Sequence, residues 1–326
     1  MSFSISHLQE KGLSLVSLKE ESTGTEAILM PAHGAAVFAF LVRTEKGSFN
    51  VIDTYKDLSE LKTEMGRSFK GSKLSPFPCR IAGAKYSFEN KEHIFNGLFP
   101  DGTAIHGLLF DKEFIIEEAL AGEASACLTM EYLYDRLDPA YPHQYSCRVK
   151  YTLRPGNILE VDTTVTNTGE GTMPIADGWH PYFQLGGRVD DWWLQFGAAA
   201  IVEFDAQLIP TGRLLKYDSF NKGRLIGTEE MDNCFLLEPP VLPTSGTANK
   251  TVPACELFNR ENGLRVSFFP GAGYPYLQLY TPPGRQSIAV ENLSSAPDSF
   301  NNKMGLLLLG AGDSQTFTVN YKVGVE

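Results

Sequence analysis

The sequence predicts an all-β protein built as one large antiparallel β-sandwich. Three observations predict this fold class: apolar and polar residues alternate with a period of two in many short segments, helical signals are few, and no linker rich in proline, glycine or serine divides the 326 residues. A chain of this length can bury roughly three quarters of its unfolded surface. Because large all-β folds of this size form one unit, we expect a single domain over residues 1–326.

The clearest strand signal is a pair of alternating segments in the middle of the chain. Tyr145–Leu153 and Leu159–Val165 place apolar side chains at every second position, and Arg154–Asn157, with its Pro-Gly pair, separates them. Two such segments around a turn predict a β-hairpin. Similar alternation predicts strands at residues 126–134, 264–269, 276–281, 287–291 and 315–323. The best helical candidate covers residues 57–65.

Charge and cysteine content exclude several classes of function. A net charge of -11 argues against binding to nucleic acid or to an anionic membrane surface, and favours a small-molecule ligand. The five cysteines are scattered without a CxxC pair, which indicates neither a disulfide framework nor a zinc site. The apolar runs are too short to span a bilayer, and the N-terminus lacks the pattern of a signal peptide. We therefore expect a cytoplasmic protein.

The most informative stretch is Asp177–Phe183, in which His180 stands between two aromatic residues. Pro181 restricts His180 to an extended backbone, which fixes the direction of the imidazole. An imidazole can transfer a proton near neutral pH, and the aromatic ring of Trp179 beside it can stack on a sugar. The alternative is a histidine satisfied within an aromatic core.

A carboxylate is the second candidate for acid–base chemistry. Glu291 ends the apolar run Ser287–Val290, and residues 292–298 are expected to form a loop. A carboxylate at the end of a buried strand should be partly desolvated, which raises its pKa and makes it a better general base. The alternative is a surface glutamate at a strand end.

Three further polar residues have settings that suit ligand binding. His106 precedes Gly107, which allows a ligand or backbone to approach, although His106 can equally cap a turn. Arg80 follows a proline-rigid segment and needs a polar partner, either a sugar hydroxyl or a structural carboxylate. Asp232, beside Asn233, offers groups suited to vicinal hydroxyls, or forms an Asx-turn.

Motifs of other chemistries are absent from the sequence. It contains no Walker P-loop, no GxGxxG after a strand, no GxSxG and no HExxH. His106, His180 and Glu291 could imitate a two-histidine, one-carboxylate metal site, but their spacing in sequence does not support one. We expect neither a metal nor a cofactor.

The chain resembles the aldose 1-epimerase (galactose mutarotase) family from about residue 27 to residue 323. The resemblance rests on six blocks in the same order: SPFPCRIAGAKYSF (75–88), IHGLLFDKEF (105–114), GWHPYF (178–183), LIPTGR (208–213), MDNCFLL (231–237) and PYLQLYTPPGRQSIAVENLSSAPDSFN (275–301). It implies a large β-sandwich of the galactose-mutarotase type. It also implies interconversion of the α and β anomers of a free aldose without a cofactor.

The resemblance assigns roles to particular residues. Glu291 matches the family's catalytic base, His180 its catalytic acid, and His106 a second histidine that helps at the ring oxygen. Arg80 and Asp232 match ligands of sugar hydroxyls. Gln278 matches a further active-site glutamine.

The sequence departs from the family pattern at one position and leaves two other functions open. Cys79 stands where many members have an asparagine before the arginine. Because cysteine is a poor hydrogen-bonding substitute for asparagine, one contact with the sugar differs here from that in those members. A non-catalytic sugar-binding protein of the same fold is one alternative. A hexose-6-phosphate 1-epimerase is another, and it would need a cationic pocket formed by residues such as Arg43, Lys73 or Lys85. We expect a monosaccharide ligand and a monomer or homodimer.

Overall fold

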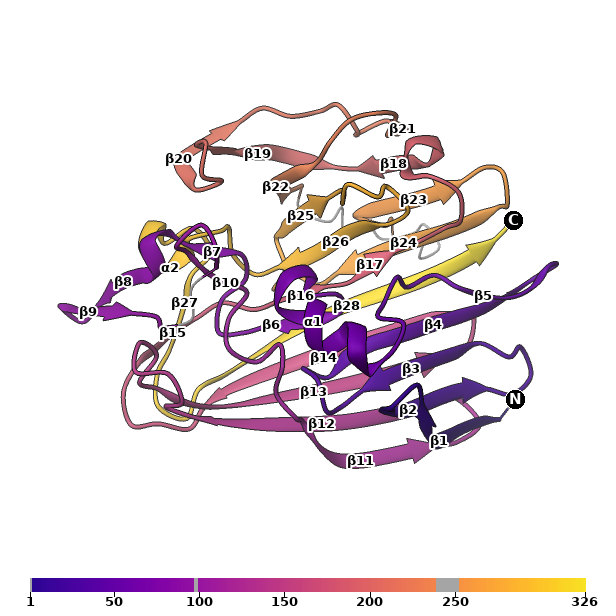
Figure 1. The fold of residues 1–326 in the computed structure, drawn as a ribbon, viewed down its shortest axis with the longest axis horizontal. Coiled ribbons are helices and arrows are strands. Elements are labelled where there is room, and N and C mark those ends of the chain that lie inside the picture. The colour runs from indigo at the N-terminus through magenta and orange to yellow at the C-terminus, as the bar shows by residue number, and fades with distance from the viewer. Residues whose placement is uncertain (1, 97–98, 239–251) are drawn as a thin grey trace, which may run out of the picture.

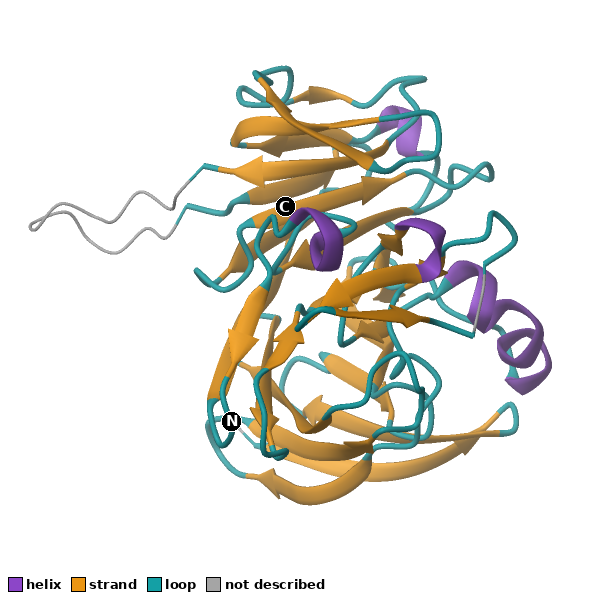
Figure 2. Ribbon diagram, turned by 90° about the vertical axis from the view of Figure 1, so that its left-hand side faces the viewer, coloured by secondary structure: helices purple, strands orange, loops and turns teal. Residues whose placement is uncertain are grey.

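The computed structural model describes residues 2–96, 99–238 and 252–326 and confirms the predicted fold class (Figure 1). Strands form nearly all of the regular structure in these residues, and Figure 2 shows them layered against one another with helices at the periphery. Every strand pairing between named strands is antiparallel.

The largest sheet has nine strands and contains the predicted hairpin. β13 and β14 pair from Tyr145 opposite Asn167 to Arg154 opposite Ile158. The turn between them uses Gly156 at φ 81°, a backbone conformation that glycine adopts at little cost. The strand order is β11 (Ile115–Ala121), β12 (Ala126–Asp135), β13 (Gln144–Arg154), β14 (Ile158–Asn167), β28 (Ser314–Val325), β24 (Leu264–Pro270), β23 (Cys255–Asn259), β18 (Trp193–Phe196) and β21 (Arg224–Leu225).

A second sheet of eight strands carries most of the candidate site. Its order is β20 (Pro210–Leu215), β19 (Ala198–Phe204), β22 (Asp232–Leu237), β25 (Tyr276–Tyr280), β26 (Ile288–Leu293), β16 (Gly178–His180) and β6 (Ser72–Leu74), with β17 (Tyr182–Phe183) pairing β26 as well. The main hydrophobic core lies between the two sheets, because it combines Val149 and Val161 of the first with Leu277 and Val290 of the second.

A third sheet, at the N-terminus, contributes a smaller core. It comprises β1 (Phe3–Glu10), β2 (Leu13–Glu20), β3 (Glu26–Met30), β4 (Ala36–Thr44) and β5 (Gly47–Asn50). Leu15 and Phe38 of this sheet pack against Leu61 and Met65 of α1 (Leu58–Ser68). The helix begins where the sequence predicts: the Asp57 side chain caps it by accepting a 2.9 Å hydrogen bond from the Glu60 amide.

Short elements join the sheets. Three two-stranded pairs lie at the end of the molecule where β8 and β9 project in Figure 1: β7 (Arg80–Ile81) with β10 (Ala104–Ile105), β8 (Lys85–Phe88) with β9 (Lys91–Ile94), and β15 (Met173–Ile175) with β27 (Leu307–Leu309). The remaining helical elements are α2 (Ser299–Asn302) and the 3₁₀ turns Ala82–Ala84 and Val189–Asp191.

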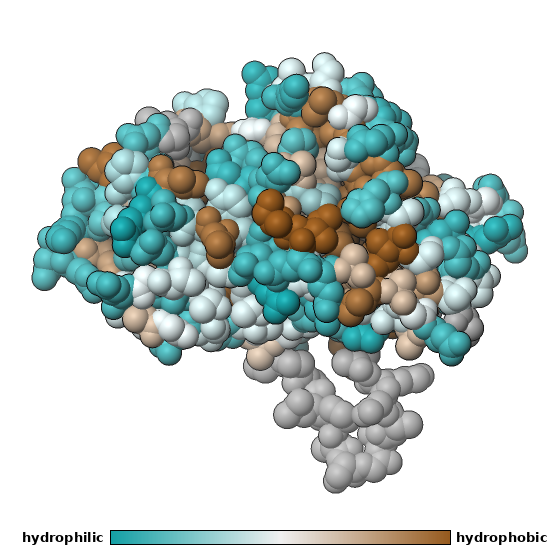
Figure 3. All heavy atoms as spheres, turned by 90° about the horizontal axis from the view of Figure 1, so that it is seen from below, coloured by the Kyte–Doolittle hydropathy of each residue, from teal (hydrophilic) through white to brown (hydrophobic). Residues whose placement is uncertain are grey.

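The outer surface is mainly polar. β11, the lowest strand in Figure 1, exposes Ile115 and Leu120. Figure 3, seen from that side, shows apolar residues gathered near the middle of a largely hydrophilic face. Within the described residues, neither α-helix has the length and apolar character needed to cross a membrane.

Candidate active site

Glu291 and Gln278 form the centre of the site because the strands β25 and β26 place them directly opposite each other. The sequence predicted that the strand would end at Glu291, and this was wrong: β26 continues to Leu293, because β25 extends far enough to pair with it. Side chains opposite one another on paired strands share a face of the sheet. Gln278 also donates a 2.7 Å hydrogen bond from Nε2 to Asp232 Oδ1, which brings a third polar residue to this face.

His180 joins this group from the other side of β26. Gly178 of β16 pairs with the residue two positions after Glu291, and Tyr182 of β17 pairs with the residue two positions before it. Because His180 lies midway between Gly178 and Tyr182, it is level with Glu291. Its Nε2 is 3.3 Å from Glu291 Oε1. The Gly71 amide donates a 2.9 Å hydrogen bond to the His180 carbonyl, which fixes the backbone. The ring stacks on Tyr182, with centroids 5.1 Å apart.

The loop after β10 brings His106 over the same face. His106 has φ 59° and Gly107 has φ 75°, and both pass close to the chain at Ser75 and Cys79. A Cβ at position 107 would lie 2.3 Å from the Ser75 carbonyl oxygen, so the close approach requires glycine. The His106 ring packs edge-on to His180, with centroids 4.8 Å apart.

Two hydrogen bonds join His106 to the backbone of Cys79, and one of them shows which ring nitrogen carries the proton. The His106 amide donates to the Cys79 carbonyl at 2.9 Å, and the Cys79 amide donates to His106 Nδ1 at 3.3 Å. Because Nδ1 accepts, the neutral ring carries its proton on Nε2 and presents a donor to the site. Cys79 therefore reaches the site through its backbone amide, which holds His106, while its thiol is buried and burial raises the pKa of that thiol well above the ordinary value.

The three candidate catalytic groups meet the geometric requirement for a metal cluster, since their ligand atoms lie within 4.8 Å of one another. The protonation of His106 does not suit one. With Nδ1 accepting a hydrogen bond, Nε2 holds a hydrogen and has no free lone pair for an ion. The arrangement suits proton transfer better than metal coordination.

Burial strongly affects the protonation of His180 and Glu291, the candidate catalytic pair. Glu291 is 2% exposed, and desolvation raises its pKa well above the usual value, with the Asp232 charge adding to the effect and Arg80 opposing it. Desolvation lowers the pKa of His180 to about 4. The pKa of His106 also falls, through burial and then the neighbouring His180 and Arg80. Burial therefore disfavours the charged form of both partners, which favours one proton held between them.

Arg80 and Asp232 flank the pair. Arg80 forms the predicted polar contact, with its Nε 3.2 Å from Asp101 Oδ2, and its charge lowers the pKa values of both Asp232 and Glu291. Burial raises the pKa of Asp232, which Arg80 and the Gln278 hydrogen bond partly offset. Asp232 therefore begins a strand beside the site and does not form the alternative Asx-turn.

Trp179 lies on the opposite face of its strand from His180. Its Nε1 donates to Thr163 Oγ1 at 3.2 Å, its ring packs edge-on to Tyr151, and the Lys73 ammonium lies 4.5 Å from its centroid. Adjacent residues in a strand point to opposite faces, so this side chain packs in the core and cannot share the pocket of His180.

Of the cations considered for a phosphate pocket, Arg43 is exposed on β4, and the two lysines have carboxylate partners elsewhere. Lys73 is fully buried on the core side, 2.6 Å from the Asp177 carboxylate, and donates to the Gly178 carbonyl. Lys85 is more than half exposed and pairs with Glu92. These positions do not form an anion site beside the catalytic pair.

Several buried polar atoms around the pair have no hydrogen-bond partner in the described protein. They are Nδ1 of His180, Oε2 of Glu291, Oε1 of Gln278 and Oγ of Ser72, which lies opposite His180 on β6. Leaving such atoms unpaired costs about 1–3 kcal/mol each, so they need a polar ligand or water. Their arrangement suits a molecule with several hydroxyl groups.

Two residues of the site were not predicted as ligands. Tyr182 stacks on His180, and its position two residues along an extended chain from His180 was a signal that both share a face. Ser72 had no such signal, because only the pairing of β6 with β16 brings it to the site.

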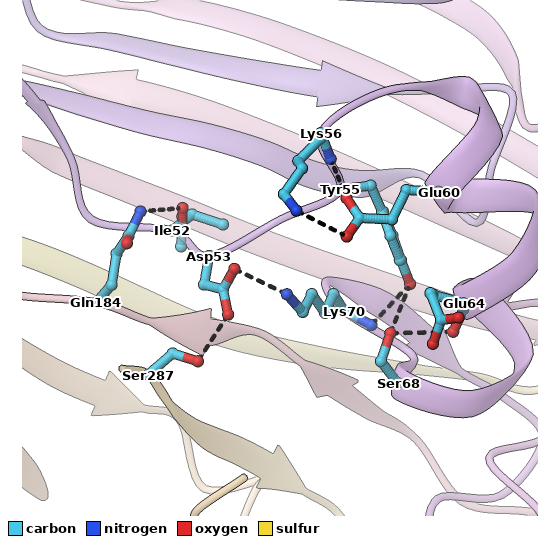
Figure 4. A network of polar contacts seen from close by, with 10 residues as sticks. All are labelled: Ile52, Asp53, Tyr55, Lys56, Glu60, Glu64, Ser68, Lys70, Gln184 and Ser287. Atoms are coloured by element: carbon cyan, nitrogen blue, oxygen red, sulfur yellow. Dashed lines mark hydrogen bonds and ion pairs between the residues drawn. The ribbon is translucent and has the colours of Figure 1, made fainter. Parts of the chain in front are cut away.

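A polar network closes one edge of the site. Asp53 accepts hydrogen bonds from Lys70 at 2.8 Å and from Ser287 at 2.6 Å (Figure 4). Its amide also donates to the Tyr182 carbonyl at 2.9 Å. Lys70 lies two residues after the end of α1, and Ser287 directly precedes β26. The network ties the chain after β5 to the strands that hold His180 and Glu291.

Comparison with known proteins bears on the fold and the family of this chain. The chain is 27% identical over 257 residues to YihR of Escherichia coli, an uncharacterized protein, with 76% of this chain and 77% of that one covered. A galactose mutarotase-like protein of Clostridium acetobutylicum superposes with a TM-score of 0.86 at 16% identity, over 100% of this chain and 99% of that one.

Galactose 1-epimerase of Lactobacillus acidophilus superposes with a TM-score of 0.78 at 20% identity, over 99% of this chain and 98% of that one. These likenesses show the fold. The model of the aldose 1-epimerase family matches residues 14–322, nearly the whole chain. The resemblance seen in the sequence is thereby confirmed, and the chain belongs to the aldose 1-epimerase family.

Proposed function

We propose that this protein is an aldose 1-epimerase that interconverts the α and β anomers of a free aldohexose. The observation that carries the proposal is the 3.3 Å approach of His180 Nε2 to Glu291 Oε1 in a buried group of unpaired polar atoms. Sugar binding alone does not need an acid–base pair that shares a proton, so this arrangement favours an enzyme over a non-catalytic binding protein.

The reaction has two proton transfers in each direction. The Glu291 carboxylate takes the proton of the anomeric hydroxyl while the His180 imidazolium protonates the ring oxygen, and the C1–O5 bond breaks. Rotation about C1–C2 presents the other face of the aldehyde. The ring closes when the O5 hydroxyl attacks C1, returning its proton to His180 while Glu291 protonates the new anomeric oxygen. Each positioned transfer typically contributes ~10²–10⁴ in rate.

The remaining residues orient the sugar and stabilise the charges. His106 donates from Nε2 to the reacting end of the sugar, and Arg80, Asp232 and Gln278 bind its hydroxyls. Tyr182 keeps the His180 ring in place from behind. Binding the sugar supplies partners for the unpaired atoms.

The test is polarimetry on freshly dissolved α-glucose and α-galactose. We expect the protein to speed their approach to anomeric equilibrium, and the Glu291→Gln variant to lose about two orders of magnitude or more of that rate. A matched variant of a distant surface residue, Glu170→Gln, should keep full activity. Equal rates for the Glu291→Gln variant and the parent protein would refute the proposal.

A further inference from the structure

The backbone of Arg80 is held from two sides at the edge of the site. On one side, Arg80 is paired with Ile105 of β10, the residue before His106. On the other side, its carbonyl accepts a 2.8 Å hydrogen bond from the amide of Asp298, in the segment that follows β26. The strand that leads to His106 and the segment after the strand of Glu291 therefore fix where the Arg80 side chain begins.

The carboxylate of Asp101 holds the far end of this side chain. Its Oδ2 accepts a 3.2 Å hydrogen bond from Nε of Arg80. Its Oδ1 accepts from the amide of Thr103 at 3.0 Å and from the hydroxyl of Thr103 at 2.6 Å. Partial burial raises the pKa of Asp101, but the hydrogen bonds from Thr103 and Arg80 outweigh this effect and lower the pKa below its ordinary value. Asp101 is therefore a carboxylate at neutral pH.

The turn that carries Asp101 is ordered by its own backbone. The amide of Phe99 donates to the carbonyl of Thr103 at 2.7 Å, and the amide of Gly102 donates to the carbonyl of Phe99 at 2.8 Å. This turn directly precedes β10, which pairs with the strand of Arg80. Asp101 thus stands at a fixed distance from the guanidinium that it contacts.

The contact at Nε restricts the orientation of the whole guanidinium. Because this group is planar, a partner held at Nε limits the directions in which the terminal nitrogens Nη1 and Nη2 can point. Within residues 2–96, 99–238 and 252–326, neither terminal nitrogen has a hydrogen-bond partner, since the contact with Asp101 involves Nε. These two nitrogens are the part of Arg80 that can bind a ligand.

The charge of Arg80 already acts on the groups of the site. Burial is the largest influence on the pKa values of Asp232, Glu291 and His106, and the Arg80 guanidinium lowers all three. The terminal nitrogens therefore lie on the side of the catalytic pair, while Asp101 holds Arg80 from the rim.

Stability of the fold does not account for the ion pair of Arg80 and Asp101. The two side chains are 19% and 40% exposed. Ion pairs that remain partly in water contribute little to the free energy of unfolding. The pair should matter mainly where the orientation of one partner matters, which is at the ligand of Arg80.

We propose that Asp101 is a positioning residue of the sugar site. By holding Nε of Arg80, its carboxylate directs the two terminal nitrogens of the guanidinium at hydroxyls of the sugar bound over Glu291. This role rests on the proposed function. Asp101 touches neither the sugar nor the reacting atoms, and it acts on binding only through Arg80.

The first test is Asp101→Asn, with anomer exchange of glucose and galactose followed by NMR. Asparagine keeps an oxygen for the bonds from Thr103 and loses the carboxylate that meets Arg80. We expect KM to rise about tenfold while kcat changes less than about twofold, because the catalytic pair remains in place. The Tm should stay within about 2 °C of that of the parent protein. An unchanged KM would overturn the proposal.

The matched control is Asp111→Asn. It breaks the ion pair of an exposed aspartate with Lys112, in the loop that follows His106, and touches no residue of the site. Its KM should equal that of the parent protein. If Asp111→Asn raised KM as much as Asp101→Asn, the effect would come from the loss of any nearby carboxylate, and the assignment to Asp101 would be wrong.

A double-mutant cycle tests whether Asp101 acts through Arg80. Arg80→Met removes the guanidinium and raises KM by itself. Adding Asp101→Asn to Arg80→Met should change KM less than about twofold, because the group that Asp101 holds is already gone. A further rise of about tenfold in the double variant would show that Asp101 acts through its turn instead, which contradicts the proposal.

Calorimetry separates this role from the proposed function. In the Glu291→Gln background, we expect Asp101→Asn to weaken the binding of glucose or galactose about tenfold, and to have no further effect once Arg80→Met is present. If the parent protein interconverts no sugar, the proposed function fails, while a loss of affinity that depends on Arg80 still supports the positioning role. Equal affinities with and without Asp101→Asn, undetectable binding included, would overturn that role whatever the activity.

Discussion

His180 Nε2 lies 3.3 Å from Glu291 Oε1, and the two side chains are only 6% and 2% exposed. Burial opposes charge on both, lowering the pKa of His180 to about 4 and raising that of Glu291. These shifts favour one proton on the pair, held by Glu291 beside a neutral His180. The proposed reaction starts once this proton has moved to His180, which leaves a carboxylate to take a proton and an imidazolium to give one.

The pH dependence of kcat/KM should consequently be bell-shaped. Below about pH 4 the pair gains a second proton and loses its base, and above the raised pKa of Glu291 it loses the shared proton and its acid. Polarimetry in a series of buffers of increasing pH would give the two limbs of the profile. A profile that shows neither limb would mean that this pair does not limit the rate.

Arg80 should set the position of the alkaline limb. Its charge lowers the pKa of Glu291, so Arg80→Met should raise that pKa further and shift the limb to higher pH. The same variant should increase KM through loss of a sugar contact. Lys85→Met, the control, removes an exposed cation paired with Glu92 and should leave the limb in place. A shift to lower pH would contradict the electrostatics.

Glu291 should reduce the stability of the folded protein at neutral pH. Its folded pKa is raised, so the folded state binds more protons than the unfolded state above about pH 4.5, and stability falls as pH rises through the folded pKa. Glu291→Gln removes this pH-dependent loss of stability. We expect a higher Tm than that of the parent protein at pH 8 and little difference at pH 4, measured by scanning calorimetry. A lower Tm at pH 8 would show that the carboxylate stabilises the fold.

Trp179 should contribute to stability and not to sugar binding. Trp179→Phe loses the hydrogen bond to Thr163 and some core volume, and should lower the free energy of unfolding by about 1–3 kcal/mol. KM for the sugar should change less than twofold. A large rise in KM without loss of stability would place the indole in the substrate site.

Removal of metal ions should leave the activity intact. His106 Nδ1 accepts a hydrogen bond from the Cys79 amide, so the ring offers a donor and not a ligand to the site. Dialysis against a strong chelator, with metal content checked by mass spectrometry, should not change kcat. Loss of activity that a divalent ion restores would assign the three-residue cluster to metal binding.

The sequence was sufficient for the fold class and for the polar residues around the pair, but not for their geometry. Period-two alternation fixes which side chains share a face within one strand, which is why the hairpin of β13 and β14 could be predicted. The extension of β26 past Glu291 depends on the length of β25, a partner that local sequence does not specify. The same holds for Ser72, whose contact with the site depends on pairing across more than a hundred residues.

Trp179 illustrates a different limit. The sequence placed an aromatic ring beside His180, and the residues are adjacent, but the strand turns their side chains to opposite faces. The residue with the right spacing was Tyr182, two positions along, which stacks on His180. Alternation in β16 and β17 was interrupted by Pro181, so the register could be fixed only by pairing with β26.

The most direct measurement is a double-mutant cycle on His180 and Glu291, with anomer exchange of a free aldose followed by NMR. We expect His180→Asn and Glu291→Gln each to lower kcat by ~10²–10⁴, and the double variant to be scarcely slower than the slower single variant, because the two residues act as a unit on one proton. Multiplicative losses in the double variant, or no loss in either single variant, would contradict a shared-proton mechanism at this pair.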